Sequence, residues 1–256
     1  MQTNASPDIL VVDDSEQNRK IFALMLKRLA YTADFAENGE VALEKIQQKD
    51  YDIIFMDCEM PVMDGYIAAQ HIRQQEQQQN RSPTIIIALS AYSLPEHREA
   101  SLAAGMNDHV NKPLRLPVLK DTFAQWLEKS PKSLNATSKS VSDTTVLDTR
   151  IIEDLRKQLG EEVETILHQF LDYMSQQLQT IQSAIQEENC ETIRHIVHQF
   201  KGESLQIGAV SLGEVCKDIE ELAKQQQLEN ITATMPQLES TIQQVHTAIL
   251  AQHFPS

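Results

Sequence analysis

The sequence predicts two domains: an α/β domain with a doubly wound, five-stranded parallel sheet, followed by an all-α antiparallel helical bundle. The 256 residues are about twice the usual length of a single domain. In the first half, five short β-branched runs alternate with helix-period segments, whereas the second half contains helix-period segments alone. Between them, residues 129–147 are rich in Ser, Thr and Lys, the composition of a solvated linker. We therefore expect domains at 6–128 and 148–256.

The first domain is expected to place its strands at 9–12, 32–36, 52–56, 84–89 and 109–110. A helical segment follows each strand, and these segments begin at Ser15, Asn38, Asp64, Pro95 and Leu116. Strands that alternate with helices form a parallel sheet covered on both faces, and such sheets bind ligands at the carboxyl ends of their strands. Several acidic residues of this domain lie at those ends.

The second domain is expected to contain helices at about 149–159, 161–187, 190–206, 210–226 and 232–251. The long second helix carries one apolar stripe, formed by Ile166, Phe170, Met174, Leu178, Ile181 and Ile185. A helix with a single apolar face buries that face against its neighbours, which predicts an antiparallel bundle.

Charge and composition argue against several classes of partner. The formal net charge of −15 repels phosphate backbones and anionic lipids, so we expect no direct nucleic-acid partner. The longest purely apolar run, residues 85–89, is far shorter than the ~20 residues of a spanning helix, so we expect no membrane insertion. The three cysteines lack a metal-type spacing, and no secretory leader is evident, which predicts reduced thiols in a cytoplasmic protein.

Charged and hydroxyl side chains gather at the strand ends of the first domain. Asp13 and Asp14 follow the first strand, Asp57 ends the third, Ser90 the fourth and Lys112 the fifth. Three carboxylates in one crevice require a cation, and a ligand set of oxygens alone favours Mg²⁺ over zinc. The hydroxyl and the ammonium suit the remaining oxygens of a phosphoryl group. The pocket therefore indicates phosphoryl-transfer chemistry.

Four motifs of the first domain resemble the receiver domains of two-component response regulators, which have a flavodoxin-like fold. The motifs are VVDDSEQNR, MDCEMPVMDG, LSA and NKPL, and the resemblance covers about residues 6–128. It implies that Asp57 is the phosphoacceptor. It also implies that Asp13, Asp14 and the backbone carbonyl of Glu59 contribute to the Mg²⁺ site.

The same resemblance assigns Ser90 and Lys112 to the phosphoryl oxygens and implies a cis peptide bond between Lys112 and Pro113. His109 stands three residues before the lysine, where the family usually has a Tyr or Phe that rotates on activation. Cys58, next to the phosphoacceptor, is expected to pack behind the strand end rather than act as a redox thiol.

A histidine on the third helix of the second domain is the other candidate nucleophile. His198 projects away from the apolar stripe of its helix and is expected to face solvent, with Arg194 and Lys201 one turn to either side. A neutral imidazole is a good nucleophile, and an ammonium group beside it can neutralise an incoming phosphoryl group. Leu205 is expected to be exposed near the same face. The stripe itself consists of Ile193, Ile196, Val197, Phe200 and Ser204.

Residues 148–256 resemble the histidine-containing phosphotransfer (HPt) domain. The motif is a His with Lys and Gly three and four residues later and a further Gly about ten residues after the His, here His198, Lys201, Gly202 and Gly208. The resemblance implies that His198 carries the phosphoryl group and that Lys201 assists. It also places Glu220 where the family often has a residue that hydrogen-bonds the second imidazole nitrogen.

Three functions are compatible with these features. In a phosphorelay intermediate, a sensor histidine kinase phosphorylates Asp57, and the phosphoryl group passes through His198 to a downstream response-regulator receiver. In a signalling adaptor, phosphorylation of Asp57 changes receiver contacts and the bundle only docks partners. The chain could also be a soluble piece of a longer hybrid sensor kinase. No segment resembles a kinase nucleotide-binding domain, so we expect a phosphoryl carrier and not an ATP-dependent enzyme.

Overall fold

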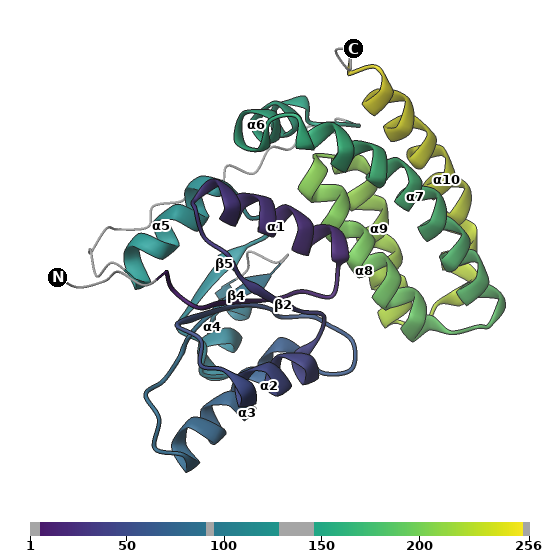
Figure 1. The fold of residues 1–256 in the computed structure, drawn as a ribbon. Helices are drawn as coiled ribbons and strands as arrows, with labels where there is room; N and C mark the ends of the chain where they lie inside the picture. Colours follow the sequence, from purple (N-terminus) through teal and green to yellow (C-terminus); the bar gives the residue numbers. More distant parts are fainter. Residues whose placement is uncertain (1–5, 91–94, 128–145, 253–256) are drawn as a thin grey trace. The chain divides into compact units, whose positions relative to one another are not determined.

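The computed structural model describes residues 6–90, 95–127 and 146–252. These residues divide into two compact units, one on each side of residue 138. The first unit is a five-stranded parallel sheet in the order β2-β1-β3-β4-β5 with helices on both faces (Figure 1). Its elements are β1 (Ile9–Val12), α1 (Glu16–Arg28), β2 (Asp34–Ala36), α2 (Gly39–Gln48), β3 (Ile53–Asp57), α3 (Gly65–Gln78), β4 (Ile85–Ser90), α4 (Pro95–Ala103), β5 (Asp108–Asn111) and α5 (Leu116–Trp126).

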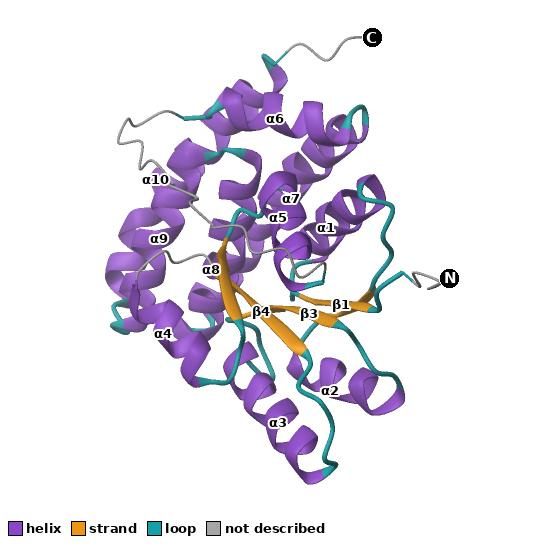
Figure 2. Cartoon of the chain, turned by 90° about the vertical axis from the view of Figure 1, so that its left-hand side faces the viewer, coloured by secondary structure: helices purple, strands orange, loops and turns teal. Residues whose placement is uncertain are grey.

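The two faces of the sheet have different cores. Figure 2 shows α2 and α3 on one side and α1 on the other. Because side chains alternate along a strand, Ile54 and Met56 of β3 pack toward the α2 and α3 side. Phe55 points to the opposite face, where its ring lies 5.0 Å from that of Phe22 in α1 and 5.6 Å from that of Phe123 in α5. Burial on both faces explains why the central strands are continuous apolar runs.

Capping side chains begin the first three helices where the sequence predicted. Ser15, Asn38 and Asp64 are the N-cap residues of α1, α2 and α3, and each side chain accepts a hydrogen bond from a backbone N–H of the first turn. The predicted fold class of this unit, with all five strand and helix pairs, is confirmed.

The second unit is helical throughout its described residues. It contains α6 (Thr149–Leu159), α7 (Glu162–Gln186), α8 (Cys190–Ile207), α9 (Val210–Lys224) and α10 (Leu228–Leu250). Each of the helices α7 to α10 packs against the next one along the chain, and α10 also packs against α7. The connections between consecutive helices are short, so consecutive helices are antiparallel. Four of the six residues in the predicted stripe of α7 are buried, namely Ile166, Phe170, Met174 and Ile181, and the other two, Leu178 and Ile185, are half-buried. All five residues of the predicted stripe of α8 are buried.

The largest boundary difference from the sequence-based expectation is at the start of the last helix. Helix α10 begins at Leu228, four residues before the predicted start, and its first turn combines the exposed Glu229 and Asn230 with the buried Ile231. The predicted linker, residues 129–147, lies outside the described residues except for Val146 and Leu147. Leu147 is buried, so at this point the chain already packs with the helical unit. Within the described part of the chain, no helix combines the length and apolar character required to cross a membrane.

Candidate functional site

The carboxylates of the first unit meet at the carboxyl edge of the sheet, as predicted. Strands β1 and β3 are neighbours, so the residues that follow β1 lie beside the last residue of β3. Carboxylate oxygens of Asp13, Asp14 and Asp57 all lie within 4.8 Å of one another. Asp13 and Asp57 are buried. This arrangement of hard oxygen donors fits a divalent cation such as Mg²⁺.

Lys112 extends from the end of β5 to the same carboxylates. Its ammonium nitrogen lies 2.7 Å from Asp13 Oδ2 and 2.5 Å from Asp57 Oδ2. Burial disfavours the charged ammonium, but Asp13 and Asp57 outweigh burial and hold the pKa of Lys112 above its usual value. The Lys112–Pro113 peptide bond is cis, which confirms that expectation. A charged ammonium group therefore faces the Asp57 carboxylate.

Asp57 is held in an environment that resists its ionisation. Burial is the largest cause, Lys112 opposes it, and the charges of Asp13 and Asp14 add to it, which together raise the pKa of Asp57 to about 7. A bound divalent cation removes this penalty because it compensates the clustered negative charge. The pocket is thus chemically suited to bind metal and anionic phosphoryl oxygens together.

Three supporting residues escaped the sequence analysis. Asn18 of α1 donates to Asp13 Oδ1 over 3.1 Å, and Arg19 donates to the backbone carbonyls of Asp13 and Asp14 at 2.6 and 2.9 Å. Gly65 lies so close to the Asp57 carbonyl that a side-chain carbon there would collide with it. The sequence signals that could have identified these residues are their positions, since Asn18 and Arg19 follow the DD pair and Gly65 ends the MDG motif. Their contacts with Asp13, Asp14 and Asp57 depend on the folded backbone, which the sequence alone does not give.

The remaining predicted residues of this unit surround the pocket. Ser90, at the end of β4, is buried, and its carbonyl accepts a hydrogen bond from the Lys112 N–H at 2.7 Å. The Glu59 N–H donates to Asp57 Oδ1 at 3.4 Å, so this residue also borders the Asp57 carboxylate. Burial raises the pKa of the Cys58 thiol to about 12, in agreement with a packing role.

His109 occupies the position where receiver domains usually have a Tyr or Phe that rotates on activation. Its Nδ1 lies 3.2 Å from the hydroxyl of Ser101 in α4, and its Nε2 lies 3.0 Å from Asn111 Oδ1. The ring therefore makes polar contacts at both nitrogens, whereas a Phe would make none and a Tyr has a single hydroxyl group. The bond between His109 and Ser101 joins β5 to α4 at this position, and the contact with Asn111 lies within β5.

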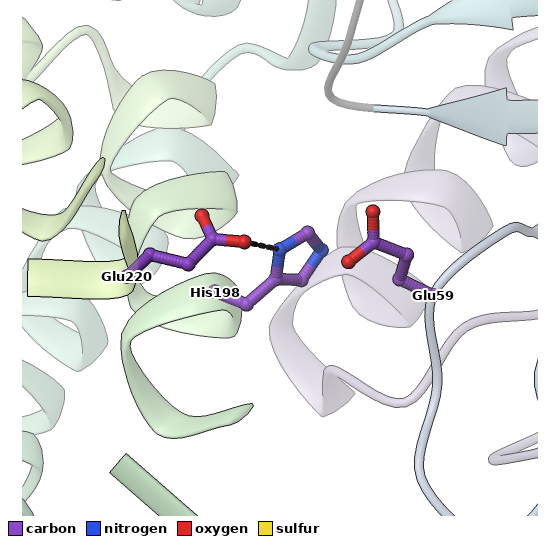
Figure 3. A group of neighbouring side chains, drawn as sticks. All are labelled: Glu59, His198 and Glu220. Atoms are coloured by element: carbon purple, nitrogen blue, oxygen red, sulfur yellow. Dashed lines mark hydrogen bonds and ion pairs between the residues drawn. The ribbon is translucent and has the colours of Figure 1, made fainter. Parts of the chain in front are cut away.

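His198 of α8 is joined to Glu220 of α9, as the HPt resemblance implied. His198 Nδ1 lies 3.1 Å from Glu220 Oε1, the bond drawn between these two side chains in Figure 3. An ionised carboxylate only accepts hydrogen bonds, so in the neutral imidazole the Nδ1 atom carries the proton and the lone pair is on Nε2. Helical period alone predicted a fully solvated ring, but one edge of the ring lies against α9.

The electrostatics of Glu220 are set by its cationic neighbours. Burial opposes ionisation of Glu220, but the hydrogen bond with His198 and the contact with Lys201 outweigh it and hold the pKa of the carboxyl well below its usual value. The Lys201 ammonium lies 2.5 Å from Glu220 Oε2. Glu220 therefore stays ionised and keeps the imidazole in one tautomer.

Three expectations for α8 require correction or refinement. Lys201 is buried and ion-paired, whereas the sequence suggested a cation in open space around His198. Leu205 is half-buried because it packs against Gly213 of α9. Gly208 ends α8 in the left-handed conformation with φ +92°, and a side chain there would collide with the Asp148 carbonyl. Both features explain why the fold requires a glycine at this position.

Comparison with known families agrees with the two units. Residues 9–124 match the response regulator receiver domain, and residues 165–248 match the Hpt domain. The chain thus joins a receiver domain to an HPt domain, two phosphotransfer modules of two-component phosphorelay signalling. The pocket around Asp57 lies in the first module and His198 lies in the second.

Curated relatives are sensor kinases that are much longer than this chain. Hybrid signal transduction histidine kinase E of Dictyostelium discoideum is 43% identical over 118 residues, which cover 46% of this chain and 7% of that protein. Sensor histidine kinase GacS of Pseudomonas protegens is 26% identical over 229 residues, which cover 88% of this chain and 25% of that protein. The chain therefore spans a quarter or less of the length of these two relatives.

Among solved structures, the receiver domain of a sensor histidine kinase from Pseudomonas aeruginosa is 37% identical. The match covers 48% of this chain and 99% of that chain, with a TM-score of 0.44. That structure has a magnesium ion coordinated in its active-site cleft.

Proposed function

We propose that this protein is a phosphorelay intermediate with two phosphoryl-carrying side chains, Asp57 and His198. An upstream sensor histidine kinase supplies the phosphoryl group to Asp57, and a downstream response-regulator receiver takes it from His198. The observation that carries the proposal is the presence, in one chain, of an acidic receiver pocket and an HPt histidine whose Nδ1 is held by Glu220. The domain limits 6–128 and 148–256 and a cytoplasmic location belong to the same proposal.

In the first transfer, a carboxylate oxygen of Asp57 attacks the phosphorus of a phosphohistidine on the kinase. The N–P bond of the donor breaks as the O–P bond forms, and Asp57 becomes an acyl phosphate. Lys112 lies 2.5 Å from Asp57 Oδ2, so its ammonium group is placed to contact a phosphoryl oxygen. The Ser90 hydroxyl is the second group proposed to bind such an oxygen.

Metal binding completes this proposal for the receiver pocket. We assign a Mg²⁺ site to Asp13, Asp14, Asp57 and the carbonyl of Glu59, and the clustered oxygens of the three aspartates support it. When bound, Mg²⁺ neutralises charge on the phosphoryl oxygens. Asn18 and Arg19 would hold the DD segment in place through their bonds to Asp13 and Asp14.

In the second transfer, the lone pair on His198 Nε2 attacks the phosphorus of the acyl phosphate. The O–P bond breaks, the Asp57 carboxylate leaves, and the Nε2–P bond forms. The imidazole retains its Nδ1 proton throughout and gains positive charge, which the Glu220 carboxylate at 3.1 Å stabilises. No proton has to leave the ring, so His198 needs a hydrogen-bond acceptor and not a general base.

The test is to identify the phosphorylated side chains directly. Radiolabelled phosphoryl supplied by a phosphorylated kinase should appear in the chain as base-stable, acid-labile phosphohistidine, in addition to base-labile acyl phosphate. His198→Gln should remove the first species and leave the second, and Asp57→Asn should remove both. Label on Asp57 without any phosphohistidine would favour the adaptor, in which the helical unit only docks partners.

A further inference from the structure

A second lysine lies beside the His198 and Glu220 pair. Lys224, in the last turn of α9, places its ammonium nitrogen 3.4 Å from Glu220 Oε1, the same oxygen that lies 3.1 Å from His198 Nδ1. The two residues are one helical turn apart, which brings Lys224 to the side of α9 that faces His198. The Lys224 side chain is 37% exposed, compared with 5% for Lys201.

The charge around His198 favours a role for this second lysine. Lys201 and Glu220 form a close pair of opposite charges, so the motif lysine is largely compensated before any phosphoryl group arrives. A phosphoryl group adds about two negative charges, and transfer makes the imidazole ring positive. The charges of Lys201, Glu220, the positive ring and the phosphoryl group sum to about −1, and Lys224 is a further cation beside this group of charges.

We propose that Lys224 is a phosphoryl-binding residue, whose ammonium group turns from Glu220 to an oxygen of the phosphoryl group on His198 Nε2. This inference rests on the proposed function of His198. The movement forms and breaks no covalent bond and transfers no proton; one ion pair is exchanged for another. The long flexible side chain of lysine and its partial exposure permit such a rotation.

Other charged groups near the histidine fit this role less well. Arg194, one turn before His198 on α8, donates two hydrogen bonds to Glu191, at 2.7 and 3.2 Å, and is held on that side of its helix. Lys224 also contacts Glu221 at 3.2 Å, but the Glu221 side chain is 54% exposed and the contact is weakened by solvent. Lys224 contacts the carboxylate that binds His198 Nδ1, and its side chain is more exposed than that of Lys201, so its ammonium group has room to turn from Glu220 to the phosphorylated ring.

The experiment uses the full chain, with radiolabelled acetyl phosphate and Mg²⁺ to load Asp57, and follows the appearance of base-stable phosphohistidine. Lys224→Met keeps most of the aliphatic stem but removes the charge, Lys224→Arg keeps a charge, and Lys217→Met removes an exposed charge elsewhere on the same helix as the matched control. We expect Lys224→Met to slow labelling of His198 about 10-fold, because one partly exposed electrostatic contact is lost. The Arg variant and the Lys217 variant should stay within about twofold of wild type.

A second readout separates a phosphoryl contact from a purely structural role. In ³¹P NMR of the phosphorylated protein, loss of a bound cation should raise the pKa for the second ionisation of the phosphoryl group in Lys224→Met and leave it unchanged in Lys217→Met. Equal labelling rates and equal ³¹P titrations for these two variants would reject the role of Lys224 while His198 still carries phosphate. Absence of phosphohistidine in wild type, with Asp57 labelled, would instead reject the proposed relay and the inference that rests on it.

Discussion

The ammonium group of Lys201 lies 2.5 Å from the carboxylate of Glu220, and this ion pair joins α8 to α9 at the same carboxylate that binds His198. Both side chains are almost completely buried. The lysine of the HPt motif therefore has a structural partner in addition to any role toward the phosphoryl group, and Glu220 connects the stability of the bundle to the orientation of His198.

Loss of the lysine alone should destabilise the helical unit. Lys201→Ala leaves the Glu220 carboxylate buried with less compensation, and we expect the free energy of unfolding to fall by about 3 kcal/mol. Denaturant unfolding of the full chain can separate the units, because the single tryptophan, Trp126, reports on the receiver and far-UV circular dichroism reports on both. The Trp126 transition should not move. The double variant Lys201→Met with Glu220→Gln should recover much of the loss, and an unchanged circular dichroism transition in Lys201→Ala would show that the ion pair is not stabilising.

The lowered pKa of Glu220 predicts that the stability of the helical unit decreases at acid pH. The pKa of Glu220 is lower in the folded protein than its ordinary value of 4.5. Its contribution to stability is therefore fully present above pH ~4.5 and is lost as the pH falls toward the lower folded pKa. Comparison of wild type with Glu220→Gln between pH 3 and 7 should show that their difference in stability shrinks toward acid. A difference that is constant or grows toward acid would contradict the assignment.

The receiver pocket predicts a strict metal requirement. Replacement of both Asp13 and Asp14 by Asn removes two carboxylates from the proposed Mg²⁺ site, and we expect phosphorylation of Asp57 to fall at least about 100-fold. Labelling from acetyl phosphate with and without EDTA measures this. Asp34→Asn, on β2 away from the pocket, is the matched control for loss of an aspartate. Undiminished labelling of the double variant would remove the metal assignment.

The variant His198→Gln should distinguish a phosphorelay intermediate from a signalling adaptor in cells. The glutamine variant should still accept phosphate on Asp57 but should block onward transfer to a downstream receiver, because the two side chains carry out different steps. Signalling output in cells measures the consequence, with His195→Gln on the same helix as the control. Full output from a chain without His198 would reject the relay.

Transfer within one chain can be tested by mixing variants. Asp57→Asn chains mixed with His198→Gln chains at micromolar concentration permit transfer only between molecules. Two groups on one chain have an effective concentration on the order of a millimolar, so labelling of His198 in the mixture should be much slower than in wild type and should rise with concentration. Equal, concentration-independent labelling in the mixture would exclude the intramolecular route as the main one.

Local sequence signals determined the order of elements and the elements on which Asp57 and His198 lie. Apolar period, capping residues and strand ends are set by neighbours within a few positions along the chain, so β1 at Ile9–Val12 and α6 at Thr149–Leu159 fall where predicted. The parallel topology follows from the alternation of strands and helices, and it brings Asp13 beside Asp57 without further information. The first turn of α10 was missed, although its Ile231 is buried and lies four residues before the buried Met235.

Tertiary structure decided which groups neutralise one another. Whether Lys201 faces solvent or Glu220, whether Leu205 is exposed or packs on Gly213, and whether Lys224 lies near His198 all depend on how α9 packs against α8. These residues are far apart in sequence, and helical period gives the direction of a side chain but not the charge that it meets. Burial and electrostatic pairing are properties of the packed helices, so the environment of the histidine became clear only once the bundle was assembled.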